Sequence, residues 1–365
     1  MNRFYLLLIF SIFLTSLPVH GASECIGDFD CDGDVDASDL ATFAIDFGKT
    51  NCAPINVITP CNCNEDASKI QQAISAFPVS GGTIYLKAGN FTLANGIHIN
   101  RSNVTVLGEQ GTSLRLDDHV NQPVILVGTD IASPGISDTL KNIRISSLEI
   151  DGNRANQDSE NDPDRNWIRN NGIDIRAVEN LWVENVKIHD ARSGGIVASW
   201  KSRNIFISNS SFYQNQIDGI ALYDSENIVV SNFLAYDNIY GAGISLDNKL
   251  KQTSFNGGVV KNNGTHGVFA RDSEDVNFHD MMIYANDENG VFLHHKSPAS
   301  GTGVQRFFFQ GCSFYDHSGH GFWLRSPVSD SPNNTIIGSV FENNTLGCIK
   351  EDPGAFVYQA ANICR

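Results

Sequence analysis

The stretch from Gly195 to Asp247 reads GIVASWKSRNIFISNSSFYQNQIDGIALYDSENIVVSNFLAYDNIYGAGISLD. A glycine followed by alternating apolar residues begins this stretch, and the same pattern returns at Gly219 and at Gly243. Counting outward gives a series of such glycines with steps of 23, 24, 24, 24, 23, 31 and 26 residues: Gly172, Gly195, Gly219, Gly243, Gly267, Gly290, Gly321 and Gly347. A nearly fixed period indicates stacked coils, each of which buries its apolar face only against its neighbours.

Each period carries two further strand signals, for example Ile205-Phe206-Ile207 and Ser211-Phe212-Tyr213. Three short strands per coil, with no helical periodicity between them, predict an all-β fold, a right-handed parallel β-helix. Asparagines recur shortly before the glycines, at Asn215, Asn238, Asn263, Asn286 and Asn344. Because asparagine tolerates a left-handed backbone and its amides can stack, we expect these residues at bends of the coil.

The β-helix domain is expected to span residues 60–365 and to begin with a capping helix. Ile70, Ala73, Ile74 and Phe77 follow helical spacing, and Pro78 ends the pattern. A helix over the first coil would hide a sheet edge that otherwise invites aggregation.

Residues 1–21 combine Arg3, an apolar run and a small-residue end, which is typical of a secretory signal. The run is shorter than the roughly 20 residues of a transmembrane helix, so we expect no membrane span. The protein is therefore predicted to be secreted, either extracellular or at the cell surface. Eight cysteines suit this location because disulfides persist in oxidising compartments, but their spacing does not decide the pairing.

The formal net charge is −16, from 25 basic and 41 acidic residues. Such a charge argues against nucleic acid as a partner. A polyanionic substrate would need positive charge that is gathered locally.

A small module is expected over residues 22–59, in which residues 28–39 read DFDCDGDVDASD. The acids and Gly33 fall where an EF-hand-type loop needs oxygen ligands and a sharp turn. The predicted Ca²⁺ ligands are Asp28, Asp30, Asp32, Asp34 (through its carbonyl), Asp36 and Asp39.

Two resemblances follow from these motifs. The calcium loop resembles one half of a bacterial dockerin repeat, which implies a cohesin-type partner. Dockerins carry two such loops and this chain carries one.

The β-helix domain resembles the pectate-lyase superfamily in four features: the capping helix, GGTIYLKAGNFTL at 81–93, SSLEIDGN at 146–153 and the coil repeat. They are most similar to the branch that holds the mannuronan C5-epimerase catalytic modules. Because that superfamily includes lyases, hydrolases, epimerases and non-catalytic proteins, the resemblance implies a fold rather than a reaction.

Period-two alternation assigns the candidate site. The first and third residues after each glycine face the core, so the second and fourth face outward. The fourth positions place Tyr223, Asp247, Arg271 and His294 on successive coils about 4.8 Å apart, and this row is the predicted catalytic site. The predicted substrate-binding residues are Arg176, Lys249, Phe269, Phe292, Lys296, Trp323 and Arg325. A loop over residues 151–171 could close over the row.

The row suits proton chemistry on a uronic acid. Elimination and C5-epimerisation both begin with removal of the acidic proton at C5, beside the carboxylate. This step needs a cation against the carboxylate and a base whose pKa is near the operating pH. The arginines suit the first task, His294 or Tyr223 suits the second, and Asp247 could orient its neighbours.

Other interpretations of these residues stay open. Asp247 and Arg271 could form a surface ion pair, and the aromatics could be covered by a loop. The epimerase signature Tyr-Gly-Phe-Asp-Pro-His falls on residues 194–199, which read GGIVAS, so none of its catalytic residues transfers by position. Residues 319–321 match the Gly-His-Gly of polygalacturonases but occupy the slot of an ordinary turn. Asp218 and His266 are second choices for the site.

These observations predict a secreted enzyme that acts on an anionic uronic-acid polysaccharide, as a lyase by β-elimination. A C5-epimerase is the alternative, followed by a polygalacturonase-type hydrolase or a non-catalytic glycan-binding β-helix. The predicted cofactor is Ca²⁺ in the N-terminal loop, and a further Ca²⁺ in the groove is left open.

Overall fold

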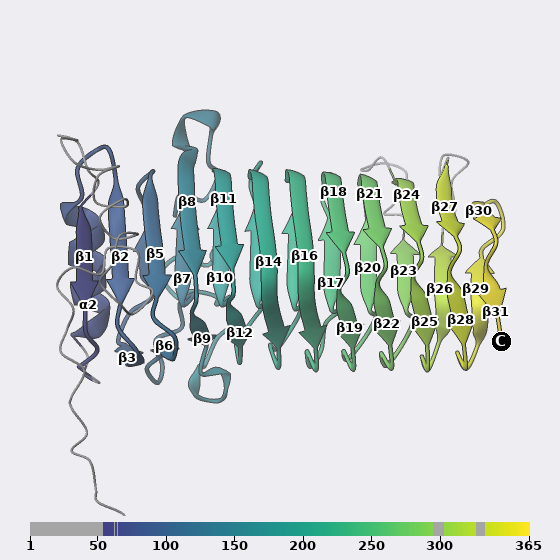
Figure 1. Cartoon of the computed structure of the whole chain (residues 1–365), viewed down its shortest axis with the longest axis horizontal. Coiled ribbons are helices and arrows are strands. Elements are labelled where there is room, and N and C mark those ends of the chain that lie inside the picture. Colours follow the sequence, from purple (N-terminus) through teal and green to yellow (C-terminus); the bar gives the residue numbers. More distant parts are fainter. Residues whose placement is uncertain (1–53, 62, 64, 295–302, 326–332) are drawn as a thin grey trace, which may run out of the picture. The chain divides into compact units, whose positions relative to one another are not determined.

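The alternating apolar residues form short parallel strands that stack into a solenoid (Figure 1). The computed structural model describes residues 54–365, apart from 62, 64, 295–302 and 326–332. The predicted signal, the six aspartates of the calcium loop and Lys296 lie outside the described residues. No helix in the described part of the chain is both long and apolar enough to cross a membrane.

One face of the solenoid is a ten-stranded parallel sheet, which we call the groove sheet. Its strands are β4 (Ile97–Ile99), β7 (Ile125–Gly128), β10 (Ile173–Arg176), β13 (Ile196–Ser199), β15 (Ile220–Tyr223), β17 (Ile244–Asp247), β20 (Val268–Arg271), β23 (Val291–His294), β26 (His320–Arg325) and β29 (Gly347–Glu351).

A 21-stranded sheet forms the other two faces and bends between them within β14 (Arg203–Tyr213) and β16 (Glu226–Tyr236). The second face also holds β1 (Ile55–Ile58), β2 (Gly82–Leu86), β5 (Val104–Gly108), β8 (Leu140–Ser146), β11 (Val178–Glu184), β18 (Lys251–Asn256), β21 (Ser273–His279), β24 (Val304–Gln310), β27 (Asn334–Ile337) and β30 (Val357–Ala360). The third face holds β3 (Gly89–Leu93), β6 (Thr112–Leu116), β9 (Glu149–Asp151), β12 (Lys187–His189), β19 (Val259–Lys261), β22 (Met282–Tyr284), β25 (Ser313–Tyr315), β28 (Val340–Glu342) and β31 (Ile363–Cys364). The predicted parallel β-helix is confirmed.

The core runs along the solenoid axis, as the alternation predicts. Ile196, Ile220 and Ile244 follow one another in register and are fully buried. Phe255, Phe278 and Phe309 stack on successive coils with ring centroids 4.9 and 4.5 Å apart. Each coil therefore buries its apolar side chains mainly against the coils before and after it.

Buried asparagines form the predicted ladder. The side-chain amide of Asn215 donates to Asn238 Oδ1 (3.0 Å), Asn238 donates to Asn263 Oδ1 (2.8 Å), and Asn263 donates to Asn286 Oδ1 (2.9 Å). The prediction was wrong about the backbone, because the left-handed residue is the one before each asparagine, such as Asp237 with a φ of 55°. The ladder asparagines thus satisfy buried polar groups at the bend, while their predecessors make the turn.

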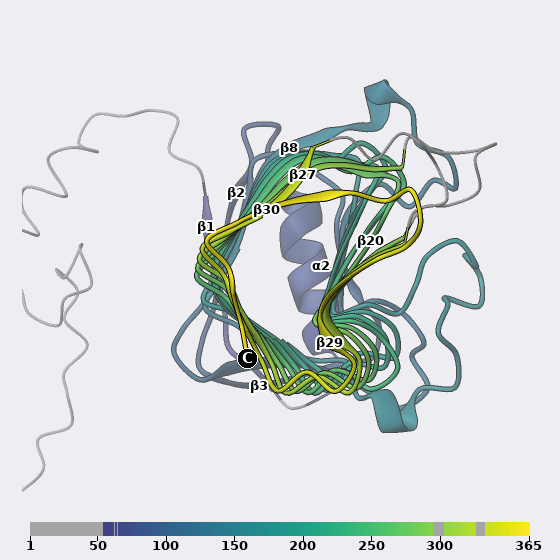
Figure 2. The ribbon, with the colours of Figure 1, turned by 90° about the vertical axis from the view of Figure 1, so that its right-hand side faces the viewer.

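The predicted capping helix is α2 (Asp66–Ala76), which lies across the end of the solenoid in Figure 2. Its Ile70 and Ile74 are fully buried against the first coil. Strand β1, which precedes the predicted boundary at residue 60, pairs with β2. The β-helix therefore begins before residue 60.

In the last coil the predicted register is wrong by one residue. Phe322 pairs with Ile349 and Trp323 with Lys350, so position zero of this coil is Cys348 rather than Gly347. Ile349 fills the inward slot, while Cys348 forms a disulfide with Cys364. A second disulfide joins Cys61 and Cys63, and Cys312 is a buried free thiol.

Candidate functional site

The groove sheet places the predicted row as expected from the repeat. Tyr223 pairs with Asp247, and Arg271 pairs with His294, which in turn pairs with Arg325. Stacking therefore collects these side chains from five separate segments. Their contacts decide which of them face open space.

Asp247 and Arg271 neutralise each other. Arg271 Nε donates to Asp247 Oδ2 at 2.9 Å, and its Nη2 donates to the same oxygen. Asp247 is 4% exposed, and its other oxygen accepts the Asn248 amide at 2.7 Å. A buried carboxylate needs such a partner, so this pair has a structural task.

The aromatic residues predicted to bind substrate pack against one another and against neighbouring side chains. The rings of Phe292 and Trp323 lie 4.8 Å apart, and His266 lies 4.7 Å from Phe292. Lys350 Nζ sits 3.9 Å from the centroid of the Trp323 ring, whose Nε1 donates to Asp352. These contacts occupy much of the ring surface that could have stacked on sugars. Phe269 is also flanked, by His266 and by Arg271.

The remaining residues of the row lie toward the C-terminal end of the groove sheet. His294 contacts the edge of the Phe292 ring, with centroids 5.6 Å apart. Arg325 is exposed, with its guanidinium 5.9 Å from the Trp323 ring. Of residues 319–321, Gly319 lies in the turn, whereas His320 and Gly321 begin β26, and the His320 amide donates to Asn289 Oδ1 (2.8 Å).

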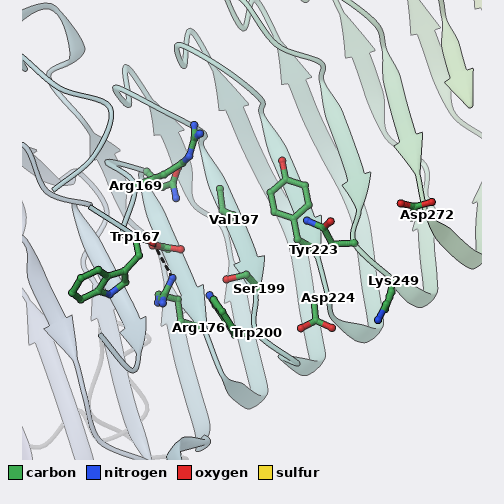
Figure 3. Close-up of a pocket in the computed structure, with 13 residues that line it drawn as sticks. Trp167, Arg169, Arg176, Val197, Ser199, Trp200, Tyr223, Asp224, Lys249 and Asp272 are labelled. Carbon is green, nitrogen blue, oxygen red and sulfur yellow. Dashed lines mark hydrogen bonds between the residues drawn. The ribbon is translucent and has the colours of Figure 1, made fainter. Parts of the chain in front are cut away.

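A pocket of about 480 Å³ lies on the N-terminal side of the predicted row (Figure 3). The loop between β9 and β10 forms one wall, the strands β10, β13 and β15 form the floor, and the turns after the strands form the rim. The lining consists of Trp167, Arg169, Asn171, Asp174, Arg176, Val197, Ser199, Trp200, Tyr223, Asp224, Asn248, Lys249 and Asp272. Tyr223, Lys249 and Arg176 are thus the predicted site residues that the pocket contains.

Tyr223 is hydrogen-bonded to an acid of its own coil. Its hydroxyl donates to Asp218 Oδ2 at 3.3 Å and lies 3.3 Å from Ser245 Oγ. Asp218 Oδ1 accepts the amide of Ala242 at 2.8 Å. Burial raises the pKa of Asp218 to about 6, although these hydrogen bonds lower it. Burial and the charge of Asp218 raise the pKa of Tyr223, so its phenol stays protonated at neutral pH.

Asp174 on β10 is a further acid of the pocket. It is 3% exposed, and burial raises its pKa to about 7, although Arg176, Asn171 and Arg169 lower it. A carboxyl with this pKa exchanges protons readily at neutral pH. Sequence reasoning missed Asp174. It could have been found as a lone carboxylate at a position that Val197 and Ala221 occupy on the next two coils.

Arg169 is a cation whose charge acts on all three groups. Its positive charge lowers the pKa of Asp174, Asp218 and Tyr223. Its guanidinium is 3.6 Å from Glu160 and 3.5 Å from Ser193 Oγ, and the residue is exposed on one side. Arg169 can therefore still meet an anionic ligand.

Arg176 holds the pocket wall. Its guanidinium donates to the carbonyls of Thr129 (3.1 Å), Ile131 (2.8 Å) and Trp167 (3.3 Å). These carbonyls belong to the two long loops beside the groove sheet, after β7 and after β9. Arg165, on the same wall, pairs with Asp162 and Asp130. The loop is therefore anchored rather than free to close as a lid.

The described residues contain two groups with metal-ligating atoms close together. One consists of Cys61, Cys63 and Asp66, but its two cysteines are joined in a disulfide. The other is Asp151, His189 and Asp190. Its carboxylates already pair with arginines, Asp151 with Arg115 and Asp190 with Arg154.

The fold and the pocket define the class: a pectate-lyase-like parallel β-helix with a polar groove on one sheet. Residues 146–360 match the family described as periplasmic copper-binding protein (NosD), and the chain belongs to that family. Copper prefers thiolates, thioethers and imidazoles. The described clusters offer a disulfide and a single imidazole among paired carboxylates, so they do not fit a copper centre.

Curated relatives are mannuronan C5-epimerases. AlgE5 from Azotobacter vinelandii is 28% identical over 252 residues, which are 58% of this chain and 25% of that protein. The enzyme from Pseudomonas putida is 27% identical over 122 residues, which are 33% of this chain and 18% of that protein. This chain thus spans a quarter or less of the length of these relatives.

Solved structures share the fold at low sequence identity. The A-module of mannuronan C-5 epimerase AlgE6 from Azotobacter vinelandii has a TM-score of 0.56 at 15% identity, covering 81% of this chain and 94% of that one. ORF18 of Geobacillus virus E2 has a TM-score of 0.65 at 14% identity, covering 89% and 63%. These likenesses show the solenoid fold.

Proposed function

We propose that this protein is an exported enzyme that inverts C5 of uronic acids in an anionic polysaccharide. The observation that carries the proposal is Tyr223, which donates a hydrogen bond to Asp218 and lines a pocket together with Asp174 and Arg169. The similarity to mannuronan C5-epimerases favours epimerisation over the β-elimination expected from the sequence. The two disulfides suit an oxidising compartment.

Each step has a candidate group in the pocket. Arg169 neutralises the sugar carboxylate, which stabilises the negative charge that develops when C5 loses its proton. Asp174 accepts that proton, since its pKa of about 7 suits a base at neutral pH. Tyr223 donates its phenolic proton to the opposite face of C5 and recovers a proton from solvent, and Asp174 releases to solvent the proton that it accepted. The bonds broken and formed balance as an isomerisation, with no redox change.

The pocket covers the segment onto which the epimerase signature falls. Val197 and Ser199 line it at positions where the signature has Asp and His. The proposed base and acid instead come from the same positions on the neighbouring coils, since Asp174 pairs with Val197 and Tyr223 follows Ser199 in the stack. A non-catalytic glycan-binding protein is the second candidate, because the signature residues themselves are absent from this segment.

Alginate, polymannuronate and pectate test the proposal. Proton NMR should show a changed C5 configuration without chain shortening, and no ultraviolet-absorbing unsaturated ends should form. Tyr223→Phe and Asp174→Asn should each lower kcat by about 10²–10⁴-fold, the usual contribution of a general acid or base. Asp287→Asn, at an exposed turn, is the matched control. The formation of unsaturated ends would instead support a lyase, and binding without any turnover would support a non-catalytic glycan-binding protein.

A further inference from the structure

The turns that leave the groove sheet differ in length from coil to coil. In three coils a single left-handed residue joins the groove sheet to the second face: Ala177, Asp224 and Asp272, with φ of 54°, 41° and 45°. In the two coils between them the turn has one extra residue, giving Trp200-Lys201 and Asn248-Lys249. The strand register returns after each insertion, since Glu179, Arg203, Glu226 and Lys251 pair in sequence.

Both residues of each longer turn are left-handed. Their φ angles are 59° and 58° at Trp200-Lys201, and 54° and 69° at Asn248-Lys249. Residues with a Cβ adopt this conformation at a cost, and such strain is concentrated at functional sites. The amides of Lys201 and Lys249 donate to the carbonyls of Asp224 and Asp272, both at 2.6 Å, so neighbouring coils hold the turns in place.

The longer turns border a second pocket, of about 270 Å³. It shares Trp200, Asp224 and Lys249 with the pocket of Tyr223, so the two pockets adjoin at these turns. Gly135 and Ile136, from the loop after β7, cover its other side. A chain-like ligand in the first pocket could continue into the second.

Two lysines of the second pocket lack an ion pair. Arg203 pairs with Glu179 at 2.9 Å, and Lys251 pairs with Glu274 at 2.7 Å. Across the described segments, no carboxylate oxygen lies within 4.0 Å of Lys201 or Lys249. The charge of Asp224, which lines the same pocket, acts on both lysines but forms no ion pair with either. Lysines without an ion pair, in a pocket of a protein with a net charge of −16, favour an anionic ligand.

We propose that Lys201 and Lys249 form a second anion subsite, which binds the carboxylate of the uronate next to the reacting one. The inference rests on the proposed function and extends it, because it makes consecutive uronates the preferred substrate. An isolated uronate among neutral sugars would fill the first pocket alone.

The double variant Lys201→Gln/Lys249→Gln tests this subsite on alginate and on partly methyl-esterified alginate. On alginate, KM should rise by about 10–100-fold, since each lost charge-assisted contact is worth about tenfold in affinity, while kcat stays the same. On the esterified polymer, the KM of the wild type should already be higher than on alginate, and the KM of the double variant should differ little from it. Lys261→Gln, on β19 of the third face, is the matched control.

The possible failures separate the two proposals. An unchanged preference for alginate in the double variant overturns the subsite and leaves the proposed function standing. A wild-type protein that neither binds nor converts any uronate polymer overturns the proposed function, and the subsite with it. Equal unfolding temperatures of wild type and variants show that the fold is retained.

Discussion

Asp174 shows how burial changes the chemistry of one residue. Its pKa rises from an ordinary 3.8 to about 7, because desolvation outweighs the nearby arginines. The folded chain therefore favours the protonated acid. The stabilisation is complete below about pH 4 and is lost as the pH rises through about 7.

Asp174→Asn should therefore stabilise the protein only at high pH. At pH 8 the free energy of unfolding should increase by up to about 4 kcal/mol, and at pH 4 it should be nearly unchanged. Thermal denaturation at both pH values measures this difference. The exposed Asp287→Asn should show no comparable dependence. An equal shift of Tm at both pH values would contradict the assigned burial effect.

Arg271 and Asp247 distinguish a structural pair from a binding residue. Arg271→Ala leaves the buried Asp247 carboxylate without its partner, and we expect a loss of about 1–3 kcal/mol in the free energy of unfolding. The double variant Arg271→Met/Asp247→Leu should recover most of this loss, as urea denaturation would show. If the single variant instead keeps its stability and loses only substrate affinity, Arg271 belongs to the binding site.

At the scale of elements, the asparagine ladder ties consecutive bends together. Asn238 accepts from Asn215 and donates to Asn263 and to the carbonyl of Phe212, all within the core. A buried polar group that loses its partners costs more than an exposed one. The ladder thus couples neighbouring coils through groups that water cannot replace.

Asn238→Ala should lower the free energy of unfolding by about 2–5 kcal/mol, because several buried groups lose partners at once. Chemical denaturation measures the change. The outward-facing Asn277→Ala, on β21, serves as control and should cost under about 1 kcal/mol. Similar costs at both positions would mean that the ladder contributes nothing beyond ordinary turn geometry.

At the scale of the whole solenoid, the two ends are closed in different ways. The helix α2 covers the first coil, whereas the last coil carries the disulfide Cys348–Cys364 and exposes Leu346, Phe356 and Tyr358. Each coil contacts mainly its neighbours, so stability is local along the axis. The C-terminal coil should therefore depend on its covalent link.

Reduction of this disulfide should loosen the C-terminal coil first. Closing a loop with a sequence separation of 16 residues stabilises by about 3 kcal/mol, so hydrogen exchange of β29–β31 should quicken on reduction, while β15 and β17 stay protected. The variant Cys348→Ser/Cys364→Ser should show the same exchange without reductant and no further change with it. Uniform acceleration along the solenoid would contradict local stability.

The sequence alone was enough to predict the solenoid, its three strands per coil, the capping helix and the row from Tyr223 to His294. These features depend on a period and an alternation, which are local properties of the chain. The predicted register of the last coil was wrong by one residue because Gly347 is the glycine that the pattern offers there. Only the pairing of Ile349 with Phe322 shows that Cys348 takes the glycine position.

The candidate site was decided by tertiary structure. Whether Asp247 meets Arg271, whether Trp323 is covered by Lys350, and whether Asp174 is desolvated depend on which side chains meet across coils and loops. The charge of Arg169 acts on Asp174, Asp218 and Tyr223 from a loop that Arg176 anchors through the carbonyl of Trp167. Electrostatics and burial sum over all neighbours in space, and a repeat pattern specifies only those along the axis.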